Sequence, residues 1–290
     1  MSALAATAPS RAMLGHLGWV LRRNPVTALA SAGALALCLV AVFGPWLTPY
    51  DPIASDVPRA LQPPSAAHWA GTDQLGRDLL SRIIAATRLD LAIALSAVGL
   101  SFVVGAVIGS FCGYAGGKLD RTVGRLVDVL MAFPLFVLAM AMVAALGNRV
   151  ENIVVATALI NLPFYIRFAR AEVNVRRNLG WVEAARAGGE SHASVVLRYL
   201  LPNILPAMAV QISLNLGWAI LNAAGLSFIG LGVRPPTPEW GILVAEGARF
   251  ITTGKWWLVG FPGLALMLSV LCFNLMGDGL RDILDPRQRT

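Results

Sequence analysis

Long apolar runs constrain the fold of this 290-residue chain more than any other feature of its sequence. A bilayer core about 30 Å thick is crossed by roughly 20 apolar residues of helix. Runs of this kind, bounded by charge, cover residues 26–47, 91–114, 126–146, 153–165, 206–231 and 256–277. The third contains Pro134, and the fourth is short and interrupted by Pro163. The sequence therefore predicts an all-α integral membrane protein with six transmembrane helices.

The composition supports a membrane protein and excludes the other broad classes. Hydrophobic residues make up 57% of the chain and charged residues 13%, whereas an ordinary globular domain is about 25% charged. A soluble chain, a disordered chain, collagen and a coiled coil are all inconsistent with these values. The first run could be a secretory signal, but its apolar part is too long and further spans follow it. We interpret it as a retained anchor.

Lys and Arg residues indicate the orientation in the membrane. Most of the 23 lie in the two tails and in the connections between the second and third and between the fourth and fifth runs. Cytoplasmic connections carry such an excess, so both termini are expected in the cytoplasm. The expected organisation is a cytoplasmic tail 1–25, a first transmembrane helix 26–48, an extracytoplasmic segment 49–88, a five-helix core 89–281 with a cytoplasmic loop 167–203, and a cytoplasmic tail 282–290.

Two spaced patterns inside the runs predict helix contacts. Gly105, Gly109, Gly113 and Gly117 repeat every fourth residue and place a glycine strip on one helix face, where another helix can approach closely. In the fifth run, polar residues share one stripe of a helix: Gln211, Asn215 and Asn222. These amides either line an aqueous translocation path or form hydrogen bonds between helices.

The sequence lacks the common motifs of catalysis, of phosphate binding and of metal binding. Neither Gly-Lys dipeptide is followed by the Ser or Thr of a phosphate-binding loop, and no nucleophile elbow or carboxylate pair is apparent. The three Cys and three His residues are dispersed, which disfavours a disulfide framework or a metal site. We expect a non-catalytic chain without cofactor or metal. If it transports a solute, the energy comes from another subunit.

Ionisable residues are scarce inside the predicted spans, unlike the relays of a proton-coupled carrier. Asp128 is the main exception, and we expect it to pair with Arg125 or to reach the headgroup region from the start of the third span. This scarcity disfavours a proton-driven secondary transporter. A motor-independent channel and a membrane scaffold remain as alternatives.

The cytoplasmic loop before the fifth run has a distinctive pattern. Asn178-Leu179-Gly180 is expected to end one helix, residues 181–187 form a short amphipathic helix, and Gly188-Gly189 permits a tight reversal. Helix is expected to resume from Glu190 and to reach the fifth run through Leu201-Pro202. Such an element either fills a groove on a soluble partner or lies on lipid headgroups.

The loop resembles that of inner-membrane permeases of ATP-binding cassette importers, at the positions Glu183-Ala184-Ala185, Gly189 and Leu201-Pro202. Further segments resemble the second, C-type permease subunit of the dipeptide, oligopeptide and nickel group: Gly71–Asp78, Leu226–Gly232 and Asp282–Arg287. The chain departs from the pattern at Arg198, where relatives often have His, and at Gly188, where they have a larger residue. The resemblance implies the type I importer permease fold.

The resemblance also implies partners and roles. The chain would pair with a homologous permease, two ATPase subunits on the cytosolic side and an extracytoplasmic solute-binding protein, in a bacterial inner membrane. The loop would form the coupling helix that docks on the ATPase. Glu183 and Arg186 would make its polar contacts, Gly189 would allow its turn, and small side chains would permit close docking at Ala184, Ala185 and Ala187.

The implied cargo is di- or oligopeptides, with nickel, glutathione or another small solute as the alternative. The external segment would face the binding protein. Within that segment, two interpretations stay open for Asp73, Arg77 and Asp78: contacts with the binding protein, or a structural ion-pair network that fixes the segment against the helices.

Overall fold

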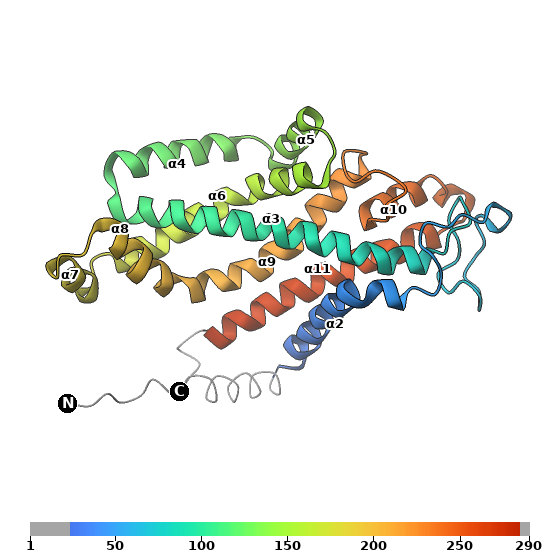
Figure 1. The fold of residues 1–290 in the computed structure, drawn as a ribbon, viewed down its shortest axis with the longest axis horizontal. Helices are drawn as coiled ribbons and strands as arrows, with labels where there is room; N and C mark the ends of the chain where they lie inside the picture. Colours follow the sequence, from blue (N-terminus) through green and yellow to red (C-terminus); the bar gives the residue numbers. More distant parts are fainter. Residues whose placement is uncertain (1–23, 285–290) are drawn as a thin grey trace.

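The computed structural model describes residues 24–284, with side chains as far as residue 281. Most of the expected tails 1–25 and 282–290 lies outside the described residues, as does the end of the Asp282–Arg287 segment. The described part is helical and contains no strand. The long helices are α2 (Pro25–Leu47), α3 (Leu79–Ala115), α4 (Gly117–Ala132), α5 (Leu135–Leu146), α6 (Val150–Arg176), α9 (Leu201–Phe228) and α11 (Trp257–Leu284) (Figure 1).

Shorter elements occupy the two ends of the bundle. At one end lie α7 (Gly180–Ala187), α8 (His192–Ser194) and η2 (Val195–Leu200), and at the other lie η1 (Val57–Arg59), α10 (Trp240–Ala248) and η3 (Ile251–Thr253). The chain enters α2 and leaves α11 on the side of the bundle that carries α7 (Figure 1). This arrangement agrees with an even number of crossings.

Five helices are long and apolar enough to span a membrane: α2, α3, α6, the continuous stretch His192–Phe228 that includes α9, and α11. The third predicted span is not a single helix. It consists of α4 and α5, which meet at 88°. Pro134 lies at the junction, and Phe133 before it is extended, with φ −82° and ψ 144°. A residue that precedes proline is driven out of the helical region, so the apolar run is bent where one straight span was expected.

Two further boundaries differ from the prediction. The fourth span is not short, because α6 covers 27 residues and passes through the buried Pro163. Packing against α3 on one side holds the helix together there, as neighbouring helices do for prolines in membranes. The second span starts well before residue 91, since α3 begins at Leu79 and Asp78 caps it by accepting a hydrogen bond from Ser81 N at 2.8 Å. The last ten residues of the expected external segment are therefore helical.

The glycine strip forms the contact between α3 and α6. A Cβ atom built on Gly105 would lie 2.5 Å from Tyr165 Cβ, and one on Gly113 would lie 2.7 Å from Arg170 O. Gly109 fits equally closely, with Ala169 Cβ 2.8 Å from the position that its Cβ would take. Gly117 does not belong to the strip, because it lies in the turn to α4 with φ +59° and open space around it. Three of the four glycines thus let the two helix backbones meet.

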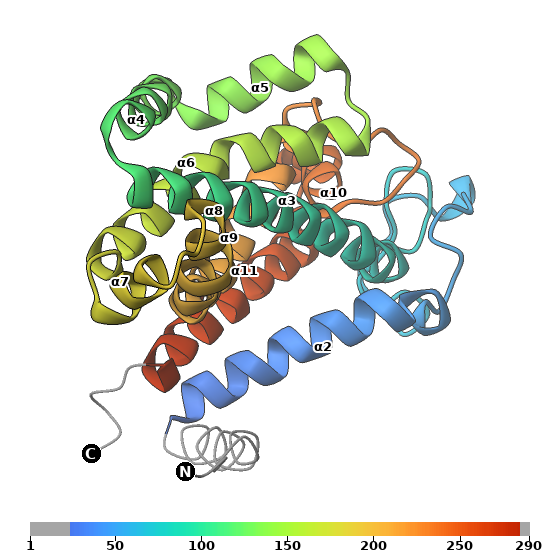
Figure 2. The same ribbon diagram turned by 60° about the vertical axis from the view of Figure 1, so that its left-hand side comes forward.

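The bundle is layered around α3. Figures 1 and 2 both show α4 and α5 on one side and α2 on the other, with α3, α6, α9 and α11 between them. The largest apolar core joins residues of α3, α6, α9 and α11, and it includes Val182 of α7. Ser213 of α9 donates a hydrogen bond to Phe273 O of α11 at 2.6 Å. This core fixes the two ends of the bundle, where the candidate sites lie.

Candidate functional site

Helix α7 projects at one end of the bundle, beyond the end of α3 (Figures 1 and 2). It covers eight residues, and its reversal relies on Gly189, whose φ is +85°. A side chain at this φ would strain the backbone. Gly188 has φ −73°, so it is not needed for the turn. The predicted helix, turn and return are therefore present, with one glycine rather than two as the reversal.

The faces of α7 differ in exposure. Glu183, Ala184 and Ala187 are exposed, Ala185 is half-buried, and Val182 is fully buried. Val182 belongs to the core that also contains Val195, Val196 and Leu200 of the return segment. Val182 thus anchors α7 on the bundle, and the outer face of α7, with its small residues and one carboxylate, is exposed.

Arg186 has contacts inside the chain. Its Nε donates a hydrogen bond to the Tyr114 hydroxyl at 3.0 Å, and its guanidinium carbon lies 4.8 Å from the centre of that ring. The same hydroxyl lies 2.9 Å from His192 Nδ1. Tyr114 is in the last turn of α3, so this group connects α7, α8 and α3 at one point. No sequence pattern points to Tyr114 or His192, since each stands alone among apolar or small residues.

The return segment enters α9 without a break. Leu201 N bonds to Val196 O, five residues back, because Val195–Leu200 forms a π turn. Pro202, which lacks an N–H donor and cannot bond to the preceding turn, directly follows this π turn. Wider turns of this kind are frequent at functional sites. The Leu201-Pro202 pair therefore marks the junction that the sequence predicted.

The structure brings together two of the three polar residues of α9. Gln211 and Asn215 line a hollow of about 360 Å³ beside Tyr165 and Phe168 of α6. Asn222 is not among the lining residues. The Asn215 amide donates to Gln211 O at 2.9 Å, and the Asn222 amide donates to Trp218 O at 2.8 Å. Both amides thus bond within their own helix.

At the opposite end, the segment before α3 is fixed by buried charges. Arg77 Nε lies 2.6 Å from Asp73 Oδ2, and Arg82 Nη1 lies 3.3 Å from the same oxygen. Glu246 of α10 lies 3.5 Å from both guanidinium groups. The side chains of Asp73, Arg77 and Arg82 are at most 3% exposed. This arrangement is an ion-pair network that joins the external segment, α3 and α10.

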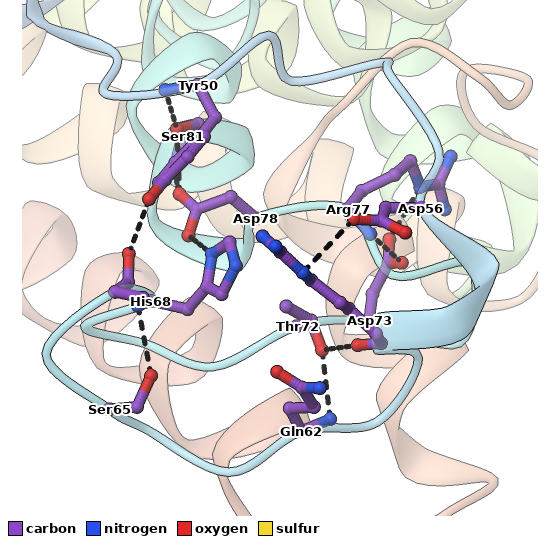
Figure 3. Close-up of polar contacts among 12 residues, drawn as sticks. Tyr50, Asp56, Gln62, Ser65, His68, Thr72, Asp73, Arg77, Asp78 and Ser81 are labelled. Atoms are coloured by element: carbon purple, nitrogen blue, oxygen red, sulfur yellow. Dashed lines mark hydrogen bonds and ion pairs between the residues drawn. The ribbon is translucent and has the colours of Figure 1, made fainter.

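Asp78 forms a second buried group beside the network (Figure 3). Its carboxylate lies 2.9 Å from His68 Nδ1 and accepts a hydrogen bond from Ser81 Oγ at 2.7 Å. Ser81 Oγ in turn accepts a hydrogen bond from Tyr50 N at 3.1 Å (Figure 3). Asp73, Arg77 and Asp78 therefore all point into the protein, and none of these three side chains is open to a partner on this surface.

Known proteins are similar in sequence to most of this chain. Residues 105–290 match the family model described as the binding-protein-dependent transport system inner membrane component, and residues 16–64 match the N-terminal TM domain of oligopeptide transport permease C. The chain belongs to this permease family. It is 41% identical over 271 residues to the probable D,D-dipeptide transport system permease protein DdpC of Escherichia coli, covering 93% of this chain and 91% of the relative.

The names of other relatives of this permease state different cargoes. Identity is 43% over 267 residues to the di/tripeptide transport system permease protein DppC of Pseudomonas aeruginosa, covering 89% of this chain and 88% of the relative. It is 41% over 250 residues to the nickel transport system permease protein NikC of Escherichia coli, covering 86% and 90%. The family is therefore that of importer permeases, and similarity alone does not separate the cargoes.

The structure of the permease contains buried acids that the sequence analysis missed. Asp90 lies inside α3 and Glu239 caps α10; they are 1% and 0% exposed. Glu239 accepts hydrogen bonds from Gly241 N and Ile242 N at 2.9 Å, and Asp90 accepts one from Trp240 N, the residue after Glu239, at 3.1 Å. Burial raises the pKa of Glu239 above its usual range. The expectation that Asp128 is the main ionisable exception is therefore wrong.

The predicted partner of Asp128 is also wrong. Asp128 Oδ1 lies 2.6 Å from Arg167 Nη2 of α6 rather than beside Arg125. Arg125 is one turn before Asp128 on α4, but Arg167 reaches the carboxylate from α6. The bend at Pro134 sets this position of α4, so the pairing was not visible in the local sequence.

Proposed function

We propose that this permease is a transmembrane subunit of an ATP-driven importer for di- or oligopeptides delivered by an extracytoplasmic binding protein. It would form the translocation path with a homologous permease and act with two ATPase subunits on the cytosolic side. The observation that carries the proposal is the exposed, small-residue face of α7 at the end of the bundle. Peptide cargo is supported by the printed names of DdpC and DppC, to which the chain is 41% and 43% identical.

In this proposal α7 is the coupling helix. Ala184 and Ala187 are small enough for close docking in an ATPase groove, and Glu183 supplies an exposed charge next to them. Val182 and the Arg186–Tyr114 contact fix α7 to the core and to α3. When the ATPases close around ATP, the displacement of α7 would pass to the membrane helices as a rigid-body motion.

The proposed path runs beside α9. Gln211 and Asn215 present uncharged amides to the 360 Å³ hollow, which suits a solute that is rich in peptide groups. Asn222, two turns further along α9, would continue this stripe toward the other face. In this proposal both chain termini and α7 are cytoplasmic, because the connections on that side carry most of the Lys and Arg residues. The bundle end that holds α10 would then face the binding protein.

Nickel and glutathione are the alternative cargoes. Identity to NikC is 41%, and identity to the glutathione transport system permease protein GsiD of Pectobacterium atrosepticum is 39% over 269 residues. These values are close to those of the peptide permeases. The cargo must therefore be measured.

The test is uptake of a labelled dipeptide into cells that lack the gene and carry the wild type, Glu183→Lys or Glu151→Lys. Glu151 is an exposed acid at the start of α6, on the opposite end of the bundle from α7, and gives a matched charge reversal. We expect Glu183→Lys to abolish uptake and ATPase co-purification at normal membrane abundance, and Glu151→Lys to retain both.

The outcomes separate docking from cargo. Normal uptake by Glu183→Lys would refute α7 as the docking helix. Wild-type cells that import no more dipeptide than the deletion strain would refute peptide cargo, and nickel and glutathione uptake would then be measured in the same strains. ATPase co-purification with the wild type decides whether the chain acts with a motor in either case.

A further inference from the structure

A basic hollow lies between α4 and α6, at the same end of the bundle as α7. Its volume is about 460 Å³. Charged side chains from both helices line it: Asp120, Arg121, Arg125, Asp128, Arg167 and Arg170. Helix α4 stands apart from the rest of the bundle in both views (Figures 1 and 2), and the hollow occupies part of that space.

The two carboxylates in the hollow are already neutralised. Asp120 is held by two nitrogens of Arg170, with Nη2 to Oδ2 at 2.7 Å. Asp128 Oδ1 lies 2.6 Å from Arg167 Nη2. Among the described residues, neither of the remaining arginines has a carboxylate within 4.0 Å; these are Arg121 and Arg125, one turn apart on α4. The hollow therefore presents two uncompensated positive charges.

Apolar surface adjoins these two arginines. A second hollow of about 320 Å³ is lined by both of them and by Thr122, Leu126 and Val129. Leu126 is 59% exposed and Val129 is 58% exposed. Helix α4 thus places a cationic pair next to an uncovered apolar strip. A ligand that matches both must combine an anionic group with a hydrocarbon chain.

The position in the bundle indicates the source of this ligand. Helix α4 starts two residues after α3 ends, and Arg167 and Arg170 are in the last three turns of α6, so the hollow lies where the spans leave the hydrocarbon core. Guanidinium groups bind phosphate oxygens through paired hydrogen bonds. Basic pockets between transmembrane helices at this level bind anionic lipid headgroups.

We propose that the hollow binds the phosphate headgroup of an anionic phospholipid, with Arg121 and Arg125 as its ligands and an acyl chain along Leu126 and Val129. The assignment to the cytoplasmic leaflet rests on the orientation given under the proposed function, but the site does not. Lipid bound here fills the gap between α4 and α6 and holds the bent third span against the bundle.

The test is native mass spectrometry of the full-length permease purified in detergent and titrated with phosphatidylglycerol or phosphatidylcholine. Arg121→Gln/Arg125→Gln is the test variant. Lys118→Gln/Arg281→Gln is the matched control, because it removes the same charge from exposed positions on α4 and α11 that line neither hollow. We expect the wild type to prefer phosphatidylglycerol. Loss of two basic contacts should weaken its binding by about tenfold or more, with the control unchanged.

Three further measurements complete the test. Arg121→Lys/Arg125→Lys keeps both charges but loses the paired guanidinium hydrogen bonds, so it should bind more weakly than the wild type and more tightly than the Gln variant. This intermediate binding separates loss of charge from loss of fold. Inorganic phosphate at millimolar concentration should not displace the lipid; displacement would show a site for free anions and overturn the proposal. The same titration on the permease co-purified with its partner subunits should give the same preference. Equal binding by the test and control variants, or a hollow closed to lipid in that complex, would also overturn it. None of these readouts depends on transport or on the cargo.

Discussion

The glycine strip between α3 and α6 gives the sharpest prediction for the stability of the bundle. In Gly109→Ala, the new methyl group would lie 2.8 Å from Ala169 Cβ and closer still to Ile166 O, which is backbone and cannot rotate away. Carbon atoms in contact prefer about 3.5–4.0 Å, so the two helices must separate by roughly 1 Å. Overpacking of this kind costs about 1–3 kcal/mol, and membrane helices have little hydrophobic driving force to offset it.

The control lies on the same helix. Gly99 has no atom within 4 Å of the position that its Cβ would take, so Gly99→Ala introduces no clash and improves helix propensity by about 1 kcal/mol at most. The measurement is the apparent melting temperature of the detergent-solubilised permease, followed by tryptophan fluorescence. We expect Gly109→Ala to melt several degrees lower than the wild type and Gly99→Ala to melt at the same temperature or higher. Equal melting of the two variants would refute the close contact as a source of stability.

Two other predictions concern the buried charges. Asp73→Ala leaves two buried guanidinium groups with Glu246 as their remaining acid and should destabilise the permease by about 3–5 kcal/mol. The control, Asp56→Ala, breaks an exposed ion pair and should cost at most about 1 kcal/mol. Similar losses of stability by the two variants in thermal melts would contradict the burial argument. Because burial raises the pKa of Glu239 in the folded state, stability should be greatest below its ordinary pKa and fall as pH rises toward the folded value. Glu239→Gln, which removes the titrating carboxyl but keeps an oxygen that can accept from Gly241 N and Ile242 N, should reduce this dependence in melts from pH 5 to 8.5, and an unchanged slope would refute it.

Much of the fold follows from apolar runs, but the ends of the helices do not. Hydropathy located all the spans, yet it placed the start of the second at residue 91 and the end of the fourth at residue 165. In each case the missing turns are polar or interrupted and are held by contacts with other elements: Asp78 caps α3, and the glycines of α3 cover α6. Such contacts depend on residues far away in sequence, so a local window does not detect them. The bend at Pro134 has a local cause, because a residue before proline avoids the helical region. Hydropathy does not detect it, since the apolar run continues through the proline.

In the candidate site, too, local features could be predicted from the sequence and long-range contacts could not. The pattern from Trp181 to Pro202 was readable, because helix breaks and a left-handed glycine leave local signals. The Arg186–Tyr114 contact was not readable, since it joins residues 72 positions apart. Arg186 was assigned to an external partner for lack of a visible internal one. The acids of the bundle were missed for a similar reason, as Glu239 lies between the fifth and sixth apolar runs, where hydropathy does not indicate that its side chain is 0% exposed.

Helix α3 connects the two ends of the permease. It has 37 residues and is therefore about 55 Å long, longer than the hydrocarbon core. Tyr114 in its last turn binds Arg186 of α7, and Arg82 in its first turn is enclosed by the acids of the external segment and α10. Between these points the glycine strip locks α3 to α6. A displacement of α7 by a docked ATPase would thus act on a helix whose other end holds the external segment, with no flexible joint between residues 79 and 115. Buried ion pairs fix α3 to the external segment and α10 at one end, and the Arg186–Tyr114 contact fixes it to α7 at the other. Both ends of α3 would therefore have to move together when α7 is displaced.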